Sequence, residues 1–121
     1  MADKRVIKIQ LPELDRSKGQ NALTSGKCRL TLETDKAYNG GVDCTAQVSW
    51  IDERGFASHV LGIGGGGDFS RTYAKVKGIA TQKRIDTMHA QTFTSEFIES
   101  IKAEVRSFYA LEAAKKASEA A

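Results

Sequence analysis

The chain has 121 residues, 40% of them apolar and 27% charged, with a single proline and a net charge of +3. This length and composition predict one folded domain with its own core and exclude disordered and collagen-like chains. The two cysteines, Cys28 and Cys44, lie sixteen residues apart, a spacing that fits no common zinc motif and favours reduced, half-buried thiols. Because no signal-peptide core or membrane-length apolar run is present, we expect a cytoplasmic protein without membrane contacts.

The first half of the chain alternates apolar and polar residues with a period of two, which is typical of half-buried antiparallel strands. For example, Ile7 and Ile9 fall on one face of their run and Lys8 and Gln10 on the other. The pattern therefore predicts an antiparallel sheet with one apolar face. Its four strands are expected at residues 6–11, 27–33, 42–51 and 56–63.

The turn between the second and third runs reads Tyr-Asn-Gly-Gly at residues 38–41, a strong hairpin signal. A three-residue loop centred on Gly40, with a glycine in the left-handed conformation, sets Leu32 opposite Val48 and keeps the two apolar faces together. We therefore predict this loop and this register.

The next turn comprises residues 52–55 and ends in a glycine. As a four-residue loop it sets Trp50 opposite Ala57 and Val48 opposite His59. The predicted fourth strand thus also places its apolar residues on the apolar face.

Residues 69–78 fit two structures. Asp68 could cap a two-turn helix that ends at Gly78. Alternatively, residues 72–76 alternate as a fifth strand would. We favour the helix and keep the strand as the alternative.

The second half predicts two helices. Thr81 is the expected N-cap of a short helix at about residues 82–91, and a longer helix begins at Ser95. The tail 115–121 has no apolar stripe and is expected to fray, which leaves residues 1–114 as a single α+β domain with helices packed on one face of the sheet. The long helix should face the sheet with the stripe Phe97, Ile101, Val105, Phe108 and Leu111.

A glycine-rich stretch precedes residue 68. Its spacing matches the dinucleotide fingerprint, but the preceding strand belongs to an antiparallel hairpin and no parallel strand follows, so dinucleotide binding is not expected. Two interpretations stay open: the backbone N–H groups hold a phosphate, or the stretch only turns the chain from sheet to helix. The candidate phosphate-binding residues here are Gly64, Gly65, Gly66 and Gly67.

Between residues 69 and 85 the chain has five basic residues and no acid. A local patch of this kind attracts phosphate groups, and an aromatic side chain within it could stack on a base. The alternative is that both this run and the outward sheet face are ordinary solvated surfaces. The candidate nucleic-acid or phosphate contacts are Arg71, Tyr73, Lys75, Lys77, Lys83 and Arg84, with weaker sheet-face contacts from Lys8, Lys27 and Arg29.

No nucleophile, paired acid or metal-ligand spacing accompanies either histidine, so we expect neither an enzyme nor a bound metal or cofactor. His59 is expected on the core face and His89 is expected to be half-buried in the short helix. Apolar residues beside the main helical stripe, including Ile98 and Tyr109, predict either a wider core or a contact in a homo-oligomer.

A four-stranded antiparallel sheet followed by a long helix resembles, in outline, the single-strand-binding domains of the whirly and transcriptional-coactivator type. This resemblance is one of architecture and assigns no residue. We therefore expect a small non-enzymatic protein that binds single-stranded nucleic acid through the basic segment after the glycines. The alternatives are a binder of a nucleotide-like phosphorylated small molecule and a protein-interaction module, such as an inhibitor or assembly factor of a phage or other mobile element.

Overall fold

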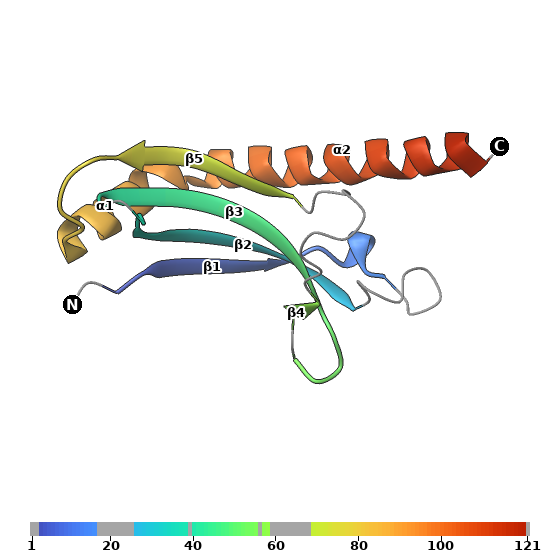
Figure 1. Cartoon of the computed structure of the whole chain (residues 1–121), viewed down its shortest axis with the longest axis horizontal. Helices are drawn as coiled ribbons and strands as arrows, with labels where there is room; N and C mark the ends of the chain where they lie inside the picture. Colours follow the sequence, from blue (N-terminus) through green and yellow to red (C-terminus); the bar gives the residue numbers. More distant parts are fainter. Residues whose placement is uncertain (1–2, 17–25, 39, 56, 59–68, 121) are drawn as a thin grey trace.

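The computed structural model describes residues 3–16, 26–38, 40–55, 57–58 and 69–120. These residues form one antiparallel sheet and two C-terminal helices, which confirms the predicted α+β fold (Figure 1). The elements in chain order are β1 (Arg5–Gln10), η1 (Pro12–Leu14), β2 (Lys27–Lys36), β3 (Val42–Ile51), β4 (Ala57–Ser58), β5 (Ser70–Val76), α1 (Gln82–Thr92) and α2 (Ser95–Ala120).

The strands β1, β2 and β3 are neighbours in the order of the sequence, and β4 and β5 both pair with the far edge of β3. Ser58 lies opposite Trp50, and the carbonyl of Phe69 accepts a hydrogen bond from the Val48 N–H at 3.0 Å. The chain therefore leaves the edge of β3 beside Trp50 and returns to it beside Val48, two residues away along the same strand. The glycine-rich stretch lies outside the described residues, but it connects two strands on one edge rather than a strand to a helix.

The prediction of a helix at residues 69–78 is wrong, and the alternative of a fifth strand is confirmed by β5. Pairing with β3 bonds one edge of this segment from Ser70 to Val76, and Phe69 at its start is fully buried. This non-local pairing outweighs the local capping signals on which the helix prediction depended. The register shifts between Cys44 and Thr45, which leaves Tyr73 as the extra residue of a β-bulge.

The register predicted for the first hairpin is wrong by two residues, since Leu32 lies opposite Ala46. The Ala37 N–H donates to the Gly41 carbonyl at 3.0 Å, and the Gly40 N–H donates to the Ala37 carbonyl at 3.1 Å. The loop therefore has three residues and a left-handed glycine, Gly40, at φ +86°, but it begins one residue earlier than predicted. A slip of two residues preserves the side-chain faces, which is why the alternation pattern alone does not detect it.

The second hairpin also differs from its prediction. Trp50 lies opposite Ser58 rather than Ala57, because the connecting loop is one residue longer than the four residues expected. Val48 bonds to Phe69, and the predicted partner His59 lies outside the described residues, as does most of the predicted fourth strand.

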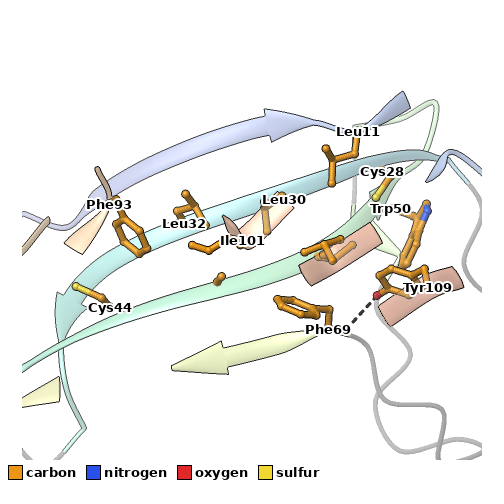
Figure 2. Packing of buried hydrophobic residues seen from close by; sticks show 13 residues of the cluster. Leu11, Cys28, Leu30, Leu32, Cys44, Trp50, Phe69, Phe93, Ile101 and Tyr109 are labelled. Atoms are coloured by element: carbon orange, nitrogen blue, oxygen red, sulfur yellow. Dashed lines mark hydrogen bonds between the residues drawn. The ribbon is translucent and has the colours of Figure 1, made fainter. Parts of the chain in front are cut away.

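Helices α1 and α2 cover one face of the sheet, and the predicted apolar face forms the core with them (Figures 1 and 2). The ring of Trp50 meets that of Tyr109 edge to face at 5.3 Å, and the Phe69 N–H donates to the Tyr109 hydroxyl at 3.0 Å. Ile85 and Phe93 are buried as well, so these residues widen the core. The most buried core residues are Leu11, Cys28, Leu30, Leu32, Cys44, Ala46, Val48, Trp50, Phe69, Ile101 and Val105.

One residue of the predicted stripe is misplaced. Leu111 is 72% exposed, whereas Tyr109 takes the inward position. The C-terminal part of α2 extends beyond the strands (Figure 1). The helix continues to Ala120, through the segment in which fraying is expected.

Both cysteines are free, as predicted, but both are fully buried rather than half-buried, because they lie on the face of the sheet that packs into the core. Burial raises the pKa of the Cys28 thiol to about 12, so this thiol stays protonated at neutral pH. Within the part of the chain that the structure describes, neither helix is long and apolar enough to cross a membrane.

Candidate functional site

The basic run predicted from the sequence is divided between the two faces of the sheet. Arg71 lies opposite Ala46, a buried residue of the face that the helices cover. Lys75 lies opposite Asp43 on the outward face. Residues four apart in a regular strand share a face, but the extra residue of the bulge reverses the alternation between them. The helix favoured for residues 69–78 would have set Arg71 and Lys75 one turn apart on the same side, and the strand instead places them on opposite faces.

Arg71 and Tyr73 both contact α2. The Tyr73 hydroxyl donates to Glu104 Oε2 at 2.7 Å, and Arg71 Nε lies 3.8 Å from Glu104 Oε1. The Arg71 guanidinium lies 4.9 Å from the ring centroid of Phe69 and 5.6 Å from that of Phe108. Burial and the bond to Glu104 raise the pKa of the Tyr73 hydroxyl. These side chains fasten β5 to α2, and the Arg71 charge already has a carboxylate beside it.

Glu104 is a residue whose role the sequence did not suggest. With Glu96 and Glu99 it forms a series of carboxylates at helical spacing near Lys102 and Arg106, which from the sequence indicated a solvated helix face with ion pairs. In the structure Lys102 pairs with Glu99, and Arg106 pairs with Glu13 of η1 at 2.6 Å. Glu104 contacts Tyr73 and Arg71 because β5 lies beside α2 in the fold. No local sequence pattern therefore predicts this role.

Lys75 has an acidic neighbourhood. Asp43 faces it across the β3–β5 pair, and Asp35 faces Asp43 across the β2–β3 pair. One oxygen of Asp43 is buried without a hydrogen-bond partner among the described residues. One carboxylate directly opposite Lys75 and a second one strand further away make this part of the outward face a poor place for a phosphate.

The remaining three basic residues of the run lie together. Lys77, Lys83 and Arg84 line a hollow of about 640 Å³ between the end of β5 and the start of α1, which we call the β5–α1 hollow. Its other lining residues are Val76, Thr81, Thr87 and Met88, and none of the lining residues is acidic. The structure thus places three cations around one concave surface without a carboxylate among them.

Local chemistry builds this hollow. Gly78 has φ +123°, and a Cβ atom there would overlap the Arg84 guanidinium. The open space lets Arg84 Nη1 donate to the Lys77 carbonyl at 3.2 Å. The Thr81 hydroxyl accepts a bond from the Arg84 N–H at 3.2 Å, which confirms Thr81 as the N-cap of α1. Since the first turn of α1 has no acidic residue, the positive end of its dipole adds to the three cations.

The weaker candidates lie elsewhere on the sheet. Lys27 and Arg29 line a second hollow, of about 710 Å³, together with Asp15, Asp52 and Glu53. Three carboxylates against two cations make this surface mixed in charge. The third weaker candidate, Lys8, lies on the same outward face opposite Thr31 of β2.

The four glycines 64–67 lie outside the described residues, as does His59. His89 is 9% exposed and its Nδ1 lies 2.8 Å from the Thr34 hydroxyl, which lies 3.3 Å from Cys44 Sγ. Burial lowers the pKa of His89, and the nearby Arg5 lowers it further. This chain of contacts joins α1 to β2 and β3.

Comparison with known proteins finds no matching family model, curated protein or solved structure. The described residues include no group of three or more histidine, cysteine, aspartate or glutamate side chains placed to hold a metal ion. The β5–α1 hollow gathers three of the predicted contact residues, Lys77, Lys83 and Arg84, on one surface.

Proposed function

We propose that this protein binds single-stranded nucleic acid, without catalysing a reaction on it, through the β5–α1 hollow. The observation that carries the proposal is the convergence of Lys77, Lys83 and Arg84 on one concave surface with no acidic lining residue. Ammonium and guanidinium groups around a hollow neutralise phosphates and release the counterions condensed on a nucleic acid.

The hollow also offers surface to a base. Val76 is 41% exposed at its edge and the half-buried Met88 contributes a soft apolar side chain. Thr81 and Thr87 add hydroxyl groups to the lining. An apolar surface flanked by cations suits the alternation of bases and phosphates along an unpaired strand.

The shape of the hollow favours a strand over an enclosed small molecule. All of its lining side chains are exposed except Met88, which is half-buried. Small-molecule sites, by contrast, bury most of the ligand surface. A chain that crosses an open surface can leave it at both sides, and only its phosphates need to be held.

The test is fluorescence anisotropy of a labelled 15-nucleotide single strand and of the matching duplex, at about 50 and 200 mM salt. We expect tighter binding of the single strand and a strong salt dependence. The double variant Lys77→Ala/Lys83→Ala should weaken binding by about tenfold and reduce the logarithmic salt slope by roughly 1.4, as two lost phosphate contacts would.

The matched control is Lys8→Ala/Lys27→Ala, which removes the same charge from the outward sheet face. It should weaken binding by less than about twofold. An equal loss in both double variants would mean that only net charge matters, and the proposed site would be wrong. If a mononucleotide binds saturably and competes with the labelled oligonucleotide, the ligand of the hollow is a small phosphorylated molecule and not a nucleic acid.

A further inference from the structure

The outer edge of β1 has no strand beside it among the described residues. β1 pairs with β2 alone, over Arg5 to Gln10. The opposite edge of the sheet differs, because β5 is joined to α2 through Tyr73 and Glu104. Figure 1 shows β1 at the margin of the sheet, on the side away from α2. The β1 edge is therefore free of a neighbouring strand among the described residues, so a further strand could pair with it.

The hydrogen-bond pattern identifies the backbone groups that face outward. The Leu11 N–H donates to the carbonyl of Cys28, which lies directly opposite it, at 3.0 Å, so the backbone groups of Leu11 and of every second residue before it point towards β2. This follows because hydrogen-bonded pairs recur at every second residue of an antiparallel ladder. The N–H and C=O groups of the residues between them point away from β2. These residues are Val6, Lys8 and Gln10.

The side chains along this edge have a definite chemistry. Ile7 and Ile9 lie on the helix side and are only half-buried against the core, so an added strand would cover them further. The segment from Lys4 to Gln10 has three cations and no acid. Lys4 approaches Glu33 and Arg5 approaches Asp86, whereas Lys8 has no carboxylate within ion-pair distance among the described residues.

We propose that the edge of β1 binds an extended acidic segment of a partner protein, which adds to the sheet as a further strand. Carboxylates at alternate positions of the segment would face Lys8 on the outward side, and aliphatic residues between them would cover Ile7 and Ile9. The backbone bonds supply affinity, and the alternating side chains supply the specificity of this mode of recognition. This site is separate from the β5–α1 hollow and does not depend on it.

Charge excludes a second copy of this chain as the occupant. The antiparallel register with the most hydrogen bonds between two β1 edges pairs Val6 with Gln10 and sets Lys8 directly opposite the Lys8 of the other copy. Like charges in directly opposed positions destabilise a strand pair. The lysine that prevents self-pairing of the edge also selects a partner of opposite charge.

The probe is a fluorescein-labelled, end-capped peptide, Thr-Val-Glu-Val-Glu-Val-Thr, with a control peptide in which lysine replaces glutamate. We expect the glutamate peptide to bind the full chain about tenfold more tightly than the lysine peptide, by anisotropy. Lys8→Glu should reverse this preference. On binding, the amide exchange of Val6, Lys8 and Gln10 should slow, since these N–H groups become bonded.

The variant Val6→Pro removes one outward N–H while no bond to β2 is lost, because proline is tolerated on edge strands. It should weaken peptide binding about tenfold, as the loss of a backbone hydrogen bond predicts, and leave the melting temperature within about 3 °C. Equal binding of the two peptides, or unchanged binding by Val6→Pro, would overturn the proposal. So would a dimer in sedimentation that Val6→Pro abolishes, because a second copy would then occupy the edge.

Discussion

The basic run has two parts with different surroundings. At the start of β5, Arg71 and Tyr73 point to the helix layer and share Glu104. Beyond the end of β5, Lys77 and Lys83 project around the β5–α1 hollow, with no acid among its lining residues. The first part holds two elements together, and the second presents charge to solvent.

This difference shows that the density of positive charge in a sequence does not locate an anion site. The face on which a cation lies and the nearest carboxylate decide whether its charge is available. Within β5, the extra residue Tyr73 places Arg71 and Lys75 on opposite faces of the sheet, because a bulge changes the face on which later residues lie. Four experiments test this difference between the two parts.

The largest effect is expected from Gly41→Ala. Gly41 has φ +80°, and an added Cβ atom would overlap the carbonyl of Val76, at the end of β5 that borders the hollow. Backbone strain and the clash together should lower the free energy of unfolding by about 2–4 kcal/mol in urea denaturation. Gly55→Ala is the control, because its φ is +86° but nothing lies near the added atom. Equal losses in both variants would contradict the close approach to Val76.

Tyr73→Phe should come next. It removes a hydrogen bond of 2.7 Å to a carboxylate and keeps the ring that packs edge to face on Phe97. We expect a loss of about 1–2 kcal/mol in the free energy of unfolding, with oligonucleotide affinity unchanged. If the variant changes oligonucleotide affinity but not stability, Tyr73 contacts the nucleic acid and does not join β5 to α2.

A smaller loss of stability is expected on acidification, because the buried His89 joins α1 to the sheet. Thr34, Cys44 and Phe93 surround the ring, with Arg5 and Asp86 as the charged neighbours. Because the folded state lowers the pKa of His89, the unfolded state takes up the proton first as pH falls below about 6.5. The free energy of unfolding should therefore be highest above that pH and decrease below it.

The measurement for His89 is the melting temperature between pH 7.5 and 5. The decline should be shallower in His89→Gln, whose amide oxygen can still accept the Thr34 hydroxyl. An identical pH dependence in the wild type and the variant would assign the acid sensitivity to other groups.

The smallest effects are expected from Arg71→Ala and Lys75→Ala. The ion pair of Arg71 is half-exposed and 3.8 Å long, so its loss should cost no more than about 1 kcal/mol. Lys75→Ala should leave the free energy of unfolding within about 0.5 kcal/mol. Neither variant should change oligonucleotide affinity by more than about twofold, as anisotropy would show. A tenfold loss in either would place the nucleic acid along β5 and break the division between the two parts.

Alternation predicted which side chains of β1, β2 and β3 face the core, and Thr81 predicted the start of α1. The exact registers were not predictable, since a slip of two residues leaves every face unchanged. Of the candidate site, the sequence supplied the residue types but not their grouping. Lys77, just after β5, and Arg84, in the first turn of α1, meet because Gly78 leaves space for the guanidinium, a contact that no residue pattern marks.

The sequence by itself determined the class of fold, the buried faces and the helix starts, because these depend on periodicity and capping within a few residues. Only the tertiary structure decided that Ser70–Val76 is a strand, that its bulge separates Arg71 from Lys75, and that the cations after it surround one hollow. The hollow needs the end of this strand beside the start of α1, where Arg84 bonds to the Lys77 carbonyl. The strand and its bulge depend on hydrogen bonds to β3, which join residues far apart in the chain. Such contacts outweigh local preference when they satisfy a whole strand at once.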